Sequence, residues 1–470
     1  MTESSTMFPV ENPATGEVIS HVPYDGPAEA TAAVDAAEGA APTWAATPPR
    51  SRSDLLRRTF ELMLRDRDEL AGLIVAENGK SRADAAAEVT YAAEFFRWYA
   101  EEAVRPAGSY GPAPAGGART LVTRRPVGIA ALVTPWNFPA AMATRKIAPA
   151  LAAGCTVVLK PAAETPLTAL AIARLLTEAG IPDGVVKLVT TTDAAAVVTT
   201  WLEDSRVRKL SFTGSTGVGR MLLRQAADRV VNASMELGGN APFVVAADAD
   251  LDTAVAAAMT AKFRNGGQAC TAANRFYVHT GIAEDFLARF GERVAALRVG
   301  PGADPATEVG PLISAKAHEG VTRLVELALA AGARVSASAE LPVDGKGHFF
   351  APLVLADVPA NAEIVRQEIF GPVAPVVTWE NETDLLRMVN GTELGLAAYV
   401  CSGDLQWAIR LGEAIDAGMV GINRGLVSDP SAPFGGVKQS GLGREGARGG
   451  LHEYTETQYL SLDWPTPAAR

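Results

Sequence analysis

The chain has 470 residues, which is enough for two or three domains with a large hydrophobic core. Its 42 Lys and Arg against 53 Asp and Glu give a net charge of −11, and the lack of a basic stripe in the sequence excludes a nucleic-acid partner. With 48% hydrophobic and 20% charged residues, the composition is typical of a globular protein and excludes a disordered chain.

The first hundred residues have the residue spacing of helices. Apolar residues at three- and four-residue steps predict helices over 31–39, 51–78 and 83–103. The next segment, 105–117, is rich in Pro and Gly and is predicted to be a linker, and 121–126 is predicted to be a strand.

Short apolar runs then alternate with helical patterns. The predicted strands are 128–134, 156–160, 185–189 and 209–213, and the predicted helices are 140–153, 168–179, 194–203 and 217–228. After Glu236 the alternation starts again, with strands at 243–246 and 275–279, helices at 251–261 and 283–294, and further units to about 421. Continuous apolar strands between helices are typical of a parallel sheet covered on both faces, so we expect an α/β protein with two doubly wound parallel-sheet domains. The segment 454–462 returns to a strand pattern and is a candidate to pair with 121–126 as a protruding ribbon.

The few cysteines and histidines are scattered. Cys155, Cys270 and Cys401 are too far apart for a disulfide framework or a zinc cluster, which predicts a reducing compartment. No two of the five histidines have the spacing of metal ligands, so we expect no metal. The first ten residues do not have the pattern of a signal peptide, and the longest apolar stretch, about 147–159, is too short to cross a bilayer. We therefore expect a cytoplasmic protein.

Three polar residues occur in unusual surroundings. Cys270 follows Gly266-Gly267-Gln268-Ala269, where small residues allow a close approach to a ligand, although a lone cysteine is commonly a small buried hydrophobic residue. Glu236 lies beside two glycines where the first domain is predicted to end, as a candidate general base or as a helix-capping or surface carboxylate. Asn137, in Pro135-Trp136-Asn137-Phe138-Pro139, follows a strand, where it is a candidate oxyanion donor or part of a rigid turn.

Two glycine clusters resemble phosphate-binding loops. Residues 441–446 match G-x-G-x-x-G, but no predicted strand precedes them and too little chain follows, so we reject a dinucleotide-binding loop there. Residues 212–219, Phe-Thr-Gly-Ser-Thr-Gly-Val-Gly, lie between a predicted strand and a helix, where backbone N–H groups can hold a pyrophosphate.

Together these segments resemble the NAD(P)-dependent aldehyde dehydrogenase superfamily over essentially the whole chain, and within it the succinate semialdehyde dehydrogenases. The matching segments are TPWNFP (134–139), LKPAAETP (159–166), KLSFTGSTGVG (209–219), MELGGNAPF (235–243), FRNGGQAC (263–270), EIFGP (368–372) and APFGGVKQSGLGREG (432–446). The resemblance implies that Cys270 is the nucleophile, that Asn137 and the Cys270 N–H hold the oxyanion, and that Glu236 activates the water that hydrolyses a thioester.

The resemblance also implies binding residues for NAD or NADP. Lys160 matches the residue that binds the adenosine ribose, Glu368 the residue that binds the nicotinamide ribose, and Gly214 and Ser215 the phosphate-facing turn. The remaining expected cofactor contacts are Thr134, Pro135, Trp136, Ala163, Leu237 and Phe370.

The implied substrate is an aldehyde with a carboxylate, succinate semialdehyde first. The matching carboxylate ligands are Arg145, Arg264 and Ser428, and the alternative for each arginine is a structural ion pair. Arg424 is a further cation near this segment whose effect stays open. A longer semialdehyde, an aromatic or an amino aldehyde are alternative substrates. A cofactor-independent thioesterase or esterase and an inactive binding protein are alternatives from other classes.

Three positions depart from the family pattern. Ala163 stands where NAD-preferring members usually carry Glu, which leaves room for NADP, although Glu164 is adjacent. The loop 189–192 lacks its usual glycine, and Ala272 replaces the second cysteine that serves some relatives as a redox switch.

The implied domain organisation is an NAD(P)-binding domain from 1–118 and 128–236 and a catalytic domain at 237–425. An oligomerisation ribbon would comprise 119–127 and 452–470, and 426–451 would return to the cofactor domain. We expect a homodimer or homotetramer without nucleic acid or membrane.

Overall fold

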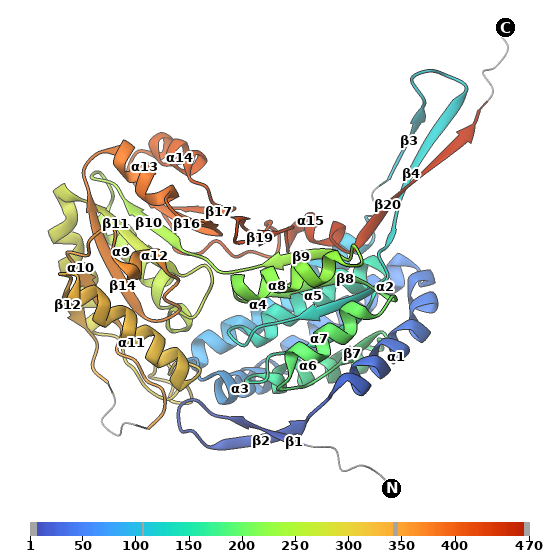
Figure 1. The fold of residues 1–470 in the computed structure, drawn as a ribbon, viewed down its shortest axis with the longest axis horizontal. Coiled ribbons are helices and arrows are strands. Elements are labelled where there is room, and N and C mark those ends of the chain that lie inside the picture. The colour runs from blue at the N-terminus through green and yellow to red at the C-terminus, as the bar shows by residue number, and fades with distance from the viewer. Residues whose placement is uncertain (1–6, 106–107, 342–345, 465–470) are drawn as a thin grey trace.

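The computed structural model describes residues 7–105, 108–341 and 346–464, and has two α/β halves and a three-stranded ribbon that projects from the body (Figure 1). The ends of the expected first domain (1–6) and of the expected ribbon (465–470) lie outside the described residues. No helix in the described part of the chain combines the length and the apolar character that a membrane crossing requires.

The first half contains a six-stranded sheet with the strand order β19-β9-β8-β5-β6-β7. Its strands are β5 (Ile129–Val133), β6 (Thr156–Lys160), β7 (Val186–Leu188), β8 (Val207–Thr213), β9 (Asn232–Glu236) and β19 (Gly441–Leu442). All residues of β5 and β6 are buried, because helices cover both faces of the sheet. Only β19, at one edge, runs antiparallel to its neighbour.

The helices of this half are α1 (Pro27–Ala46), α2 (Pro49–Arg65), α3 (Arg67–Asn78), α4 (Arg82–Ala103), α5 (Pro139–Ala153), α6 (Pro166–Ala179), α7 (Ala194–Glu203), α8 (Thr216–Ala227) and α15 (Ala447–His452). Helix α5 begins with Pro139 and ends at Gly154, whose φ of 96° is the left-handed conformation that favours glycine at a helix end. Helices α4 and α5 pack against each other, so they fix the loop that follows β5.

The second half contains a seven-stranded sheet with the order β12-β13-β14-β11-β10-β16-β17. Its strands are β10 (Ala241–Val245), β11 (Ala273–His279), β12 (Arg334–Ser338), β13 (Leu353–Ala356), β14 (Val373–Trp379), β16 (Ala397–Cys401) and β17 (Met419–Ile422). Its helices are α9 (Leu251–Phe263), α10 (Ala283–Ala295), α11 (Ala315–Ala330), α12 (Glu363–Arg366), α13 (Glu382–Asn390) and α14 (Leu405–Ala414), with short 3-10 turns η1 (Arg264–Gly267) and η2 (Thr280–Ile282). Here too a single edge strand, β12, is antiparallel within the described sheet.

The ribbon consists of β3 (Ser109–Pro112), β4 (Ala118–Pro126) and β20 (Thr455–Asp463). Strand β20 pairs with β4 in antiparallel register from Thr455↔Pro126 to Asp463↔Ala118, which confirms the expected pairing of the chain end with 121–126. A short pair, β15 (Leu394–Gly395) with β18 (Val437–Lys438), ties the returning chain to the second half.

Two expectations about the elements are wrong in detail, and three of the described strands were missed. The expected helix 51–78 is divided at Asp66, whose φ of −98° and ψ of 20° end α2 and begin α3. The expected linker 105–117 contains β3, and residues 106–107 lie outside the described part. The hairpin of β1 (Met7–Glu11) and β2 (Val18–Pro23) and the strand β9 were not expected.

Candidate active site

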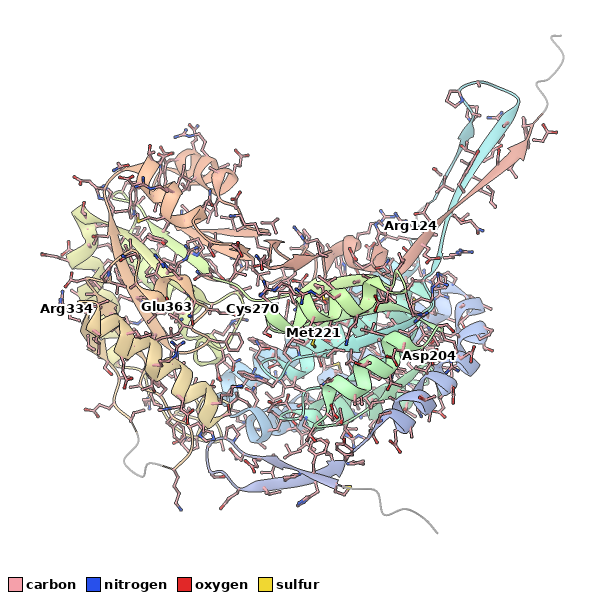
Figure 2. The ribbon with its side chains drawn as sticks, in the orientation of Figure 1. Arg124, Asp204, Met221, Cys270, Arg334 and Glu363 are labelled. Atoms are coloured by element: carbon pink, nitrogen blue, oxygen red, sulfur yellow. The ribbon has the colours of Figure 1, made fainter. Side chains whose placement is uncertain are left out.

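The candidate site lies where the carboxyl ends of the first sheet face the second half (Figure 2). Strands β5, β8 and β9 end there at Val133, Thr213 and Glu236. Because ligands of open α/β sheets bind at the carboxyl ends of strands, this junction is the expected place for a cofactor. Figure 2 shows Cys270 at the junction, on the side of the second half.

A cavity that opens to solvent, with about 690 Å³ of empty space, occupies the junction. It brings together many of the expected residues: Pro135, Trp136, Asn137, Gly214, Ser215, Leu237, Cys270, Glu368 and Phe370. Thr134, Lys160 and Ala163 are not among the described residues that line it. The cavity also has Met142 in its wall, a residue for which the sequence offered no signal beyond an apolar helix position.

Cys270 is held by an unusual backbone. It follows η1, in which Asn265, Gly266 and Gly267 have φ values of 52°, 59° and 74°. Desolvation raises the pKa of the Cys270 thiol to about 12, although its side chain is only half-buried, and the positive charge of Arg145 opposes this shift. The resting thiol is therefore protonated at neutral pH, and it becomes a nucleophile only when a base removes its proton.

Asn137 follows β5 and lies in the same cavity as Cys270. Its Nδ2 donates to the Gln268 carbonyl oxygen at 3.1 Å, while its buried Oδ1 has no hydrogen-bond partner among the described residues. A buried ion pair fixes this loop from behind, because Lys80 Nζ contacts Glu88 at 2.5 Å and donates to the Asn137 carbonyl at 2.8 Å.

Glu236 is the last residue of β9, and only 2% of its surface is exposed. Neither carboxylate oxygen has a hydrogen-bond partner among the described residues. Burial, followed by the negative charge of Glu445, raises the pKa of Glu236 well above that of an ordinary glutamate, while Arg145 and Lys146 oppose this. It is therefore neither a helix cap nor a surface residue, although it is not among the described residues that line the cavity of Cys270.

The turn between β8 and α8 has the geometry of an anion site. Ser215 caps α8, and its Oγ accepts the Val218 N–H at 3.4 Å. Gly214 lies so close to the Phe212 ring that a larger residue would clash with it. The expected strand–turn–helix around 212–219 is confirmed, and helix N–H groups there suit a phosphate. By contrast, 441–446 begins in the two-residue antiparallel strand β19 and ends at Gly446, which precedes the six-residue helix α15, so no strand precedes its glycines and no parallel strand–helix–strand unit is formed.

The two expected ribose ligands lie on opposite sides of the junction. At the end of β6, Lys160 Nζ donates to the Pro161 carbonyl at 2.7 Å, and burial lowers the pKa of Lys160 to about 8. Glu368 accepts the Gly239 N–H at 3.1 Å, and burial raises its pKa to about 7. Ala163 is half-buried and packs against the cluster formed by the β1–β2 hairpin, while Glu164 is exposed. Of these expected cofactor residues, Glu368 lines the cavity of Cys270, whereas Lys160 and Ala163 lie outside its described lining.

A second cavity, of about 290 Å³ of empty space, adjoins Cys270. It brings Arg145, Arg264 and Ser428 together with the nucleophile. Its other lining residues are Tyr91, Phe138, Met142, Ala269, Thr271 and Phe434. Tyr91 was missed by the sequence analysis because it has the spacing of an ordinary core residue on α4.

The two arginines have different surroundings. Arg145 is buried, its Nε lies 2.6 Å from Glu445, and its guanidinium stacks on the Phe434 ring at 4.0 Å. The guanidinium of Arg264 lies 5.2 Å from the Phe138 ring centre, and it makes no hydrogen bond or ion pair among the described residues. The structural ion pair that we considered as an alternative is therefore present for Arg145 but not for Arg264.

Comparison with known proteins agrees with this arrangement. The model of the aldehyde dehydrogenase family matches residues 1–460. A succinate-semialdehyde dehydrogenase of Paenarthrobacter nicotinovorans is 53% identical over 93% of this chain and 97% of its own length. A glutarate-semialdehyde dehydrogenase of Pseudomonas putida is 48% identical over 96% of this chain and 94% of its own.

The chain is also similar to a solved structure. The crystal structure of an E. coli NADP dependent enzyme superposes with a TM-score of 0.96, with 47% identity, and covers 98% of this chain and 95% of that one. A single family therefore matches the chain in sequence and in fold. The chain belongs to the aldehyde dehydrogenase family.

Proposed function

We propose that the chain oxidises an aldehyde with a distal carboxylate, succinate semialdehyde first, to the carboxylic acid with NADP or NAD. The observation that carries this proposal is the guanidinium of Arg264, which has no counter-ion among the described residues and lies in the same cavity as Cys270. An aldehyde whose other end is anionic would supply the missing negative charge.

The charges of the neighbouring side chains support an anionic substrate. Glu445 lies 2.6 Å from Arg145 and 2.5 Å from Lys146, so two cations share this one carboxylate. Arg264 adds a second positive charge to the same cavity. Relatives named for succinate and glutarate semialdehyde act on such ω-carboxylated aldehydes.

The protein's residues divide the chemistry between a soft nucleophile and a separate base. Cys270 Sγ, after loss of its proton, attacks the aldehyde carbon, and the Asn137 amide stabilises the resulting oxyanion of the thiohemiacetal. The bound nicotinamide supplies the hydride acceptor. Glu236 then takes a proton from the water that hydrolyses the Cys270 thioester.

The cofactor residues support a nicotinamide dinucleotide, with or without a 2′-phosphate on the adenosine ribose. Lys160 and Glu368 would hold the two riboses, and Gly214 with Ser215 the phosphates. Ala163 presents no carboxylate to the adenosine ribose, which favours NADP, and the similar E. coli structure is named as NADP dependent.

The proposal also includes the domain organisation and the association of subunits. We keep the predicted division into a cofactor domain (1–118, 128–236), a catalytic domain (237–425) and a return segment (426–451), except that β3 and the first residue of β4 belong to the ribbon. The ribbon exposes large side chains, with Tyr110 58%, Tyr459 57% and Trp464 46% accessible. We place this ribbon between subunits of a homodimer or homotetramer in the cytoplasm.

A steady-state matrix tests the activity. Succinate semialdehyde, glutarate semialdehyde, uncharged butanal, an aromatic aldehyde and an amino aldehyde are each assayed with NAD and with NADP. We expect the two semialdehydes to have the highest kcat/KM, and a preference for butanal or the aromatic aldehyde would overturn the proposal. Hydrolysis of an ester or thioester at full rate without nucleotide would favour the thioesterase alternative instead.

Replacement of Arg264 tests whether its guanidinium binds the substrate carboxylate. In Arg264→Leu, the ratio of kcat/KM for succinate semialdehyde to kcat/KM for butanal is expected to fall about 100-fold, because a charge-assisted pair is lost. The same ratio in Arg424→Leu, whose side chain is exposed and outside the described cavity lining, serves as the control. An unchanged ratio in Arg264→Leu would exclude this arginine as the carboxylate ligand.

A further inference from the structure

Tyr91 has a hydroxyl proton for which the described residues provide no acceptor. The residue lies on α4 and lines the cavity of about 290 Å³ that also holds Arg145, Arg264 and Ser428. Its Oη is fully buried, and no described residue accepts a hydrogen bond from it. Because a buried hydroxyl proton without an acceptor destabilises the folded state, such a group is expected to be satisfied by something that enters the cavity.

The packing of α4 fixes where this hydroxyl lies. The Tyr91 ring packs edge-on against Phe95, one turn further along the same face, with ring centres 5.0 Å apart. One turn earlier, Glu88 accepts the Ala140 and Ala141 N–H groups at the start of α5, at 2.9 and 3.3 Å. Helix α5 carries Arg145, so the hydroxyl and this guanidinium are held on two helices that are joined by buried contacts.

The electrostatics place the hydroxyl at the arginine end of the cavity. Burial raises the pKa of Tyr91, and the charges of Arg145 and Arg264, together with a hydrogen bond that Arg145 donates to the phenol oxygen, oppose this shift, so both cations are near the phenol. Tyr91 therefore stays a neutral O–H donor at physiological pH. The arginines can only donate hydrogen bonds, so they cannot satisfy this donor, whereas a carboxylate has about four acceptor sites.

We propose that Tyr91 Oη donates a hydrogen bond to the distal carboxylate of the substrate and is a specificity-determining residue for carboxylated aldehydes. The inference rests on the proposed function and adds to it a neutral donor outside the arginines and the serine. The two arginines supply the positive charge, and the tyrosine orients the substrate carboxylate, because the packing of its ring against Phe95 fixes the position of its hydroxyl.

The test is Tyr91→Phe, which removes one oxygen and keeps the ring. We expect the ratio of kcat/KM for succinate semialdehyde to kcat/KM for butanal to fall about tenfold, through a higher KM for the semialdehyde. The ratio does not depend on the folded fraction of a preparation, because both substrates are measured on the same enzyme. Without substrate, the melting temperature of Tyr91→Phe is expected to be equal to or above that of the wild type. If the hydroxyl had only a structural role, its removal would lower the melting temperature.

Tyr99→Phe is a matched control. Tyr99 lies on the same helix, and its hydroxyl is also buried with no acceptor among the described residues, but it does not line the cavity. We expect Tyr99→Phe to leave the substrate ratio unchanged. An equal fall of the ratio in both variants, or no fall in Tyr91→Phe, would overturn the proposal for Tyr91.

The role of Tyr91 and the proposed function can be contradicted independently of each other. If Arg264→Leu lowers the substrate ratio and Tyr91→Phe does not, only the role of Tyr91 is lost. If the wild type prefers butanal, or if Arg264→Leu has no effect, the proposed function itself fails.

Discussion

Ala163 is a single methyl group at the position that faces the adenosine ribose in the proposed cofactor site. Replacing it by glutamate places a carboxylate where it can accept from a ribose 2′-hydroxyl but repels a 2′-phosphate. We expect Ala163→Glu to lower kcat/KM for NADP relative to NAD by about tenfold or more. Steady-state kinetics with both cofactors measure this, and Ala163→Gln, which has the same size without the charge, should change the ratio much less.

Glu236 links activity and stability with opposite signs. Its pKa is raised in the folded protein by burial, so folding favours its protonated form, and this contribution to stability is lost as the pH rises through the raised pKa. As the base for thioester hydrolysis, however, it works only above that pKa. The same ionisation therefore costs stability and enables turnover.

Glu236→Gln separates the two effects. We expect it to lose most of its turnover while still releasing one burst of reduced cofactor, because Cys270 is intact and only deacylation is blocked. The melting temperature of the variant relative to wild type should be higher at pH 9 than at pH 5. A difference in melting temperature that is constant with pH would mean that Glu236 does not titrate in this range.

At the scale of elements, the segment that joins the two halves depends on one glycine. A Cβ on Gly239 would overlap the carbonyl oxygen of Cys270. Because both groups belong to the backbone, neither segment can move away without a large cost in free energy. We expect Gly239→Ala to displace the nucleophile and lower kcat/KM about 100-fold or more. Gly72→Ala in α3, where a Cβ meets nothing within 4 Å, is the control that should keep full activity. A fully active Gly239→Ala enzyme would show that the Cys270 loop can adjust.

The elements that were predicted correctly are those with a strong local pattern. Strand β6 and helix α7 have the predicted bounds, 156–160 and 194–203, because an apolar run and a helical period identify them without reference to the rest of the chain. The break at Asp66 was missed because the apolar period continues across it. Strand β9, Asn-Ala-Ser-Met-Glu, has no apolar run and becomes a strand only because it fills the sheet between β8 and β19.

In the site, too, the sequence predicts residues that lie in local motifs but not contacts between distant segments. Cys270, Asn137 and the arginines were expected from motifs that resemble a family, and the structure brings them together. The ion pair between Arg145 and Glu445 joins residues 300 positions apart, and no local pattern reports such a contact. The burial of the Tyr91 hydroxyl is likewise a property of how α4 meets its neighbours.

At the scale of the whole molecule, the ribbon is the part with the least contact to the body (Figure 1). Its exposed aromatic and apolar side chains favour contact with another copy of the chain. We expect the double variant Tyr459→Lys and Leu460→Lys to sediment at a smaller mass than the wild type. Leu405→Lys, at an exposed apolar residue of α14 away from the ribbon, should keep the wild-type mass. An unchanged mass of the double variant would exclude these side chains from the subunit contact.

The late return of the chain to its first half has a consequence for biosynthesis. Strand β19 completes the sheet beside β9, β20 pairs with β4, and Glu445 provides the counter-charge for the buried Arg145 and Lys146. A ribosome-bound chain that ends before these residues has two buried cations without their carboxylate, and such a state is costly. Although its other strands are contiguous and are made first, the first half is therefore expected to reach its native state last, after the end of the chain has left the ribosome.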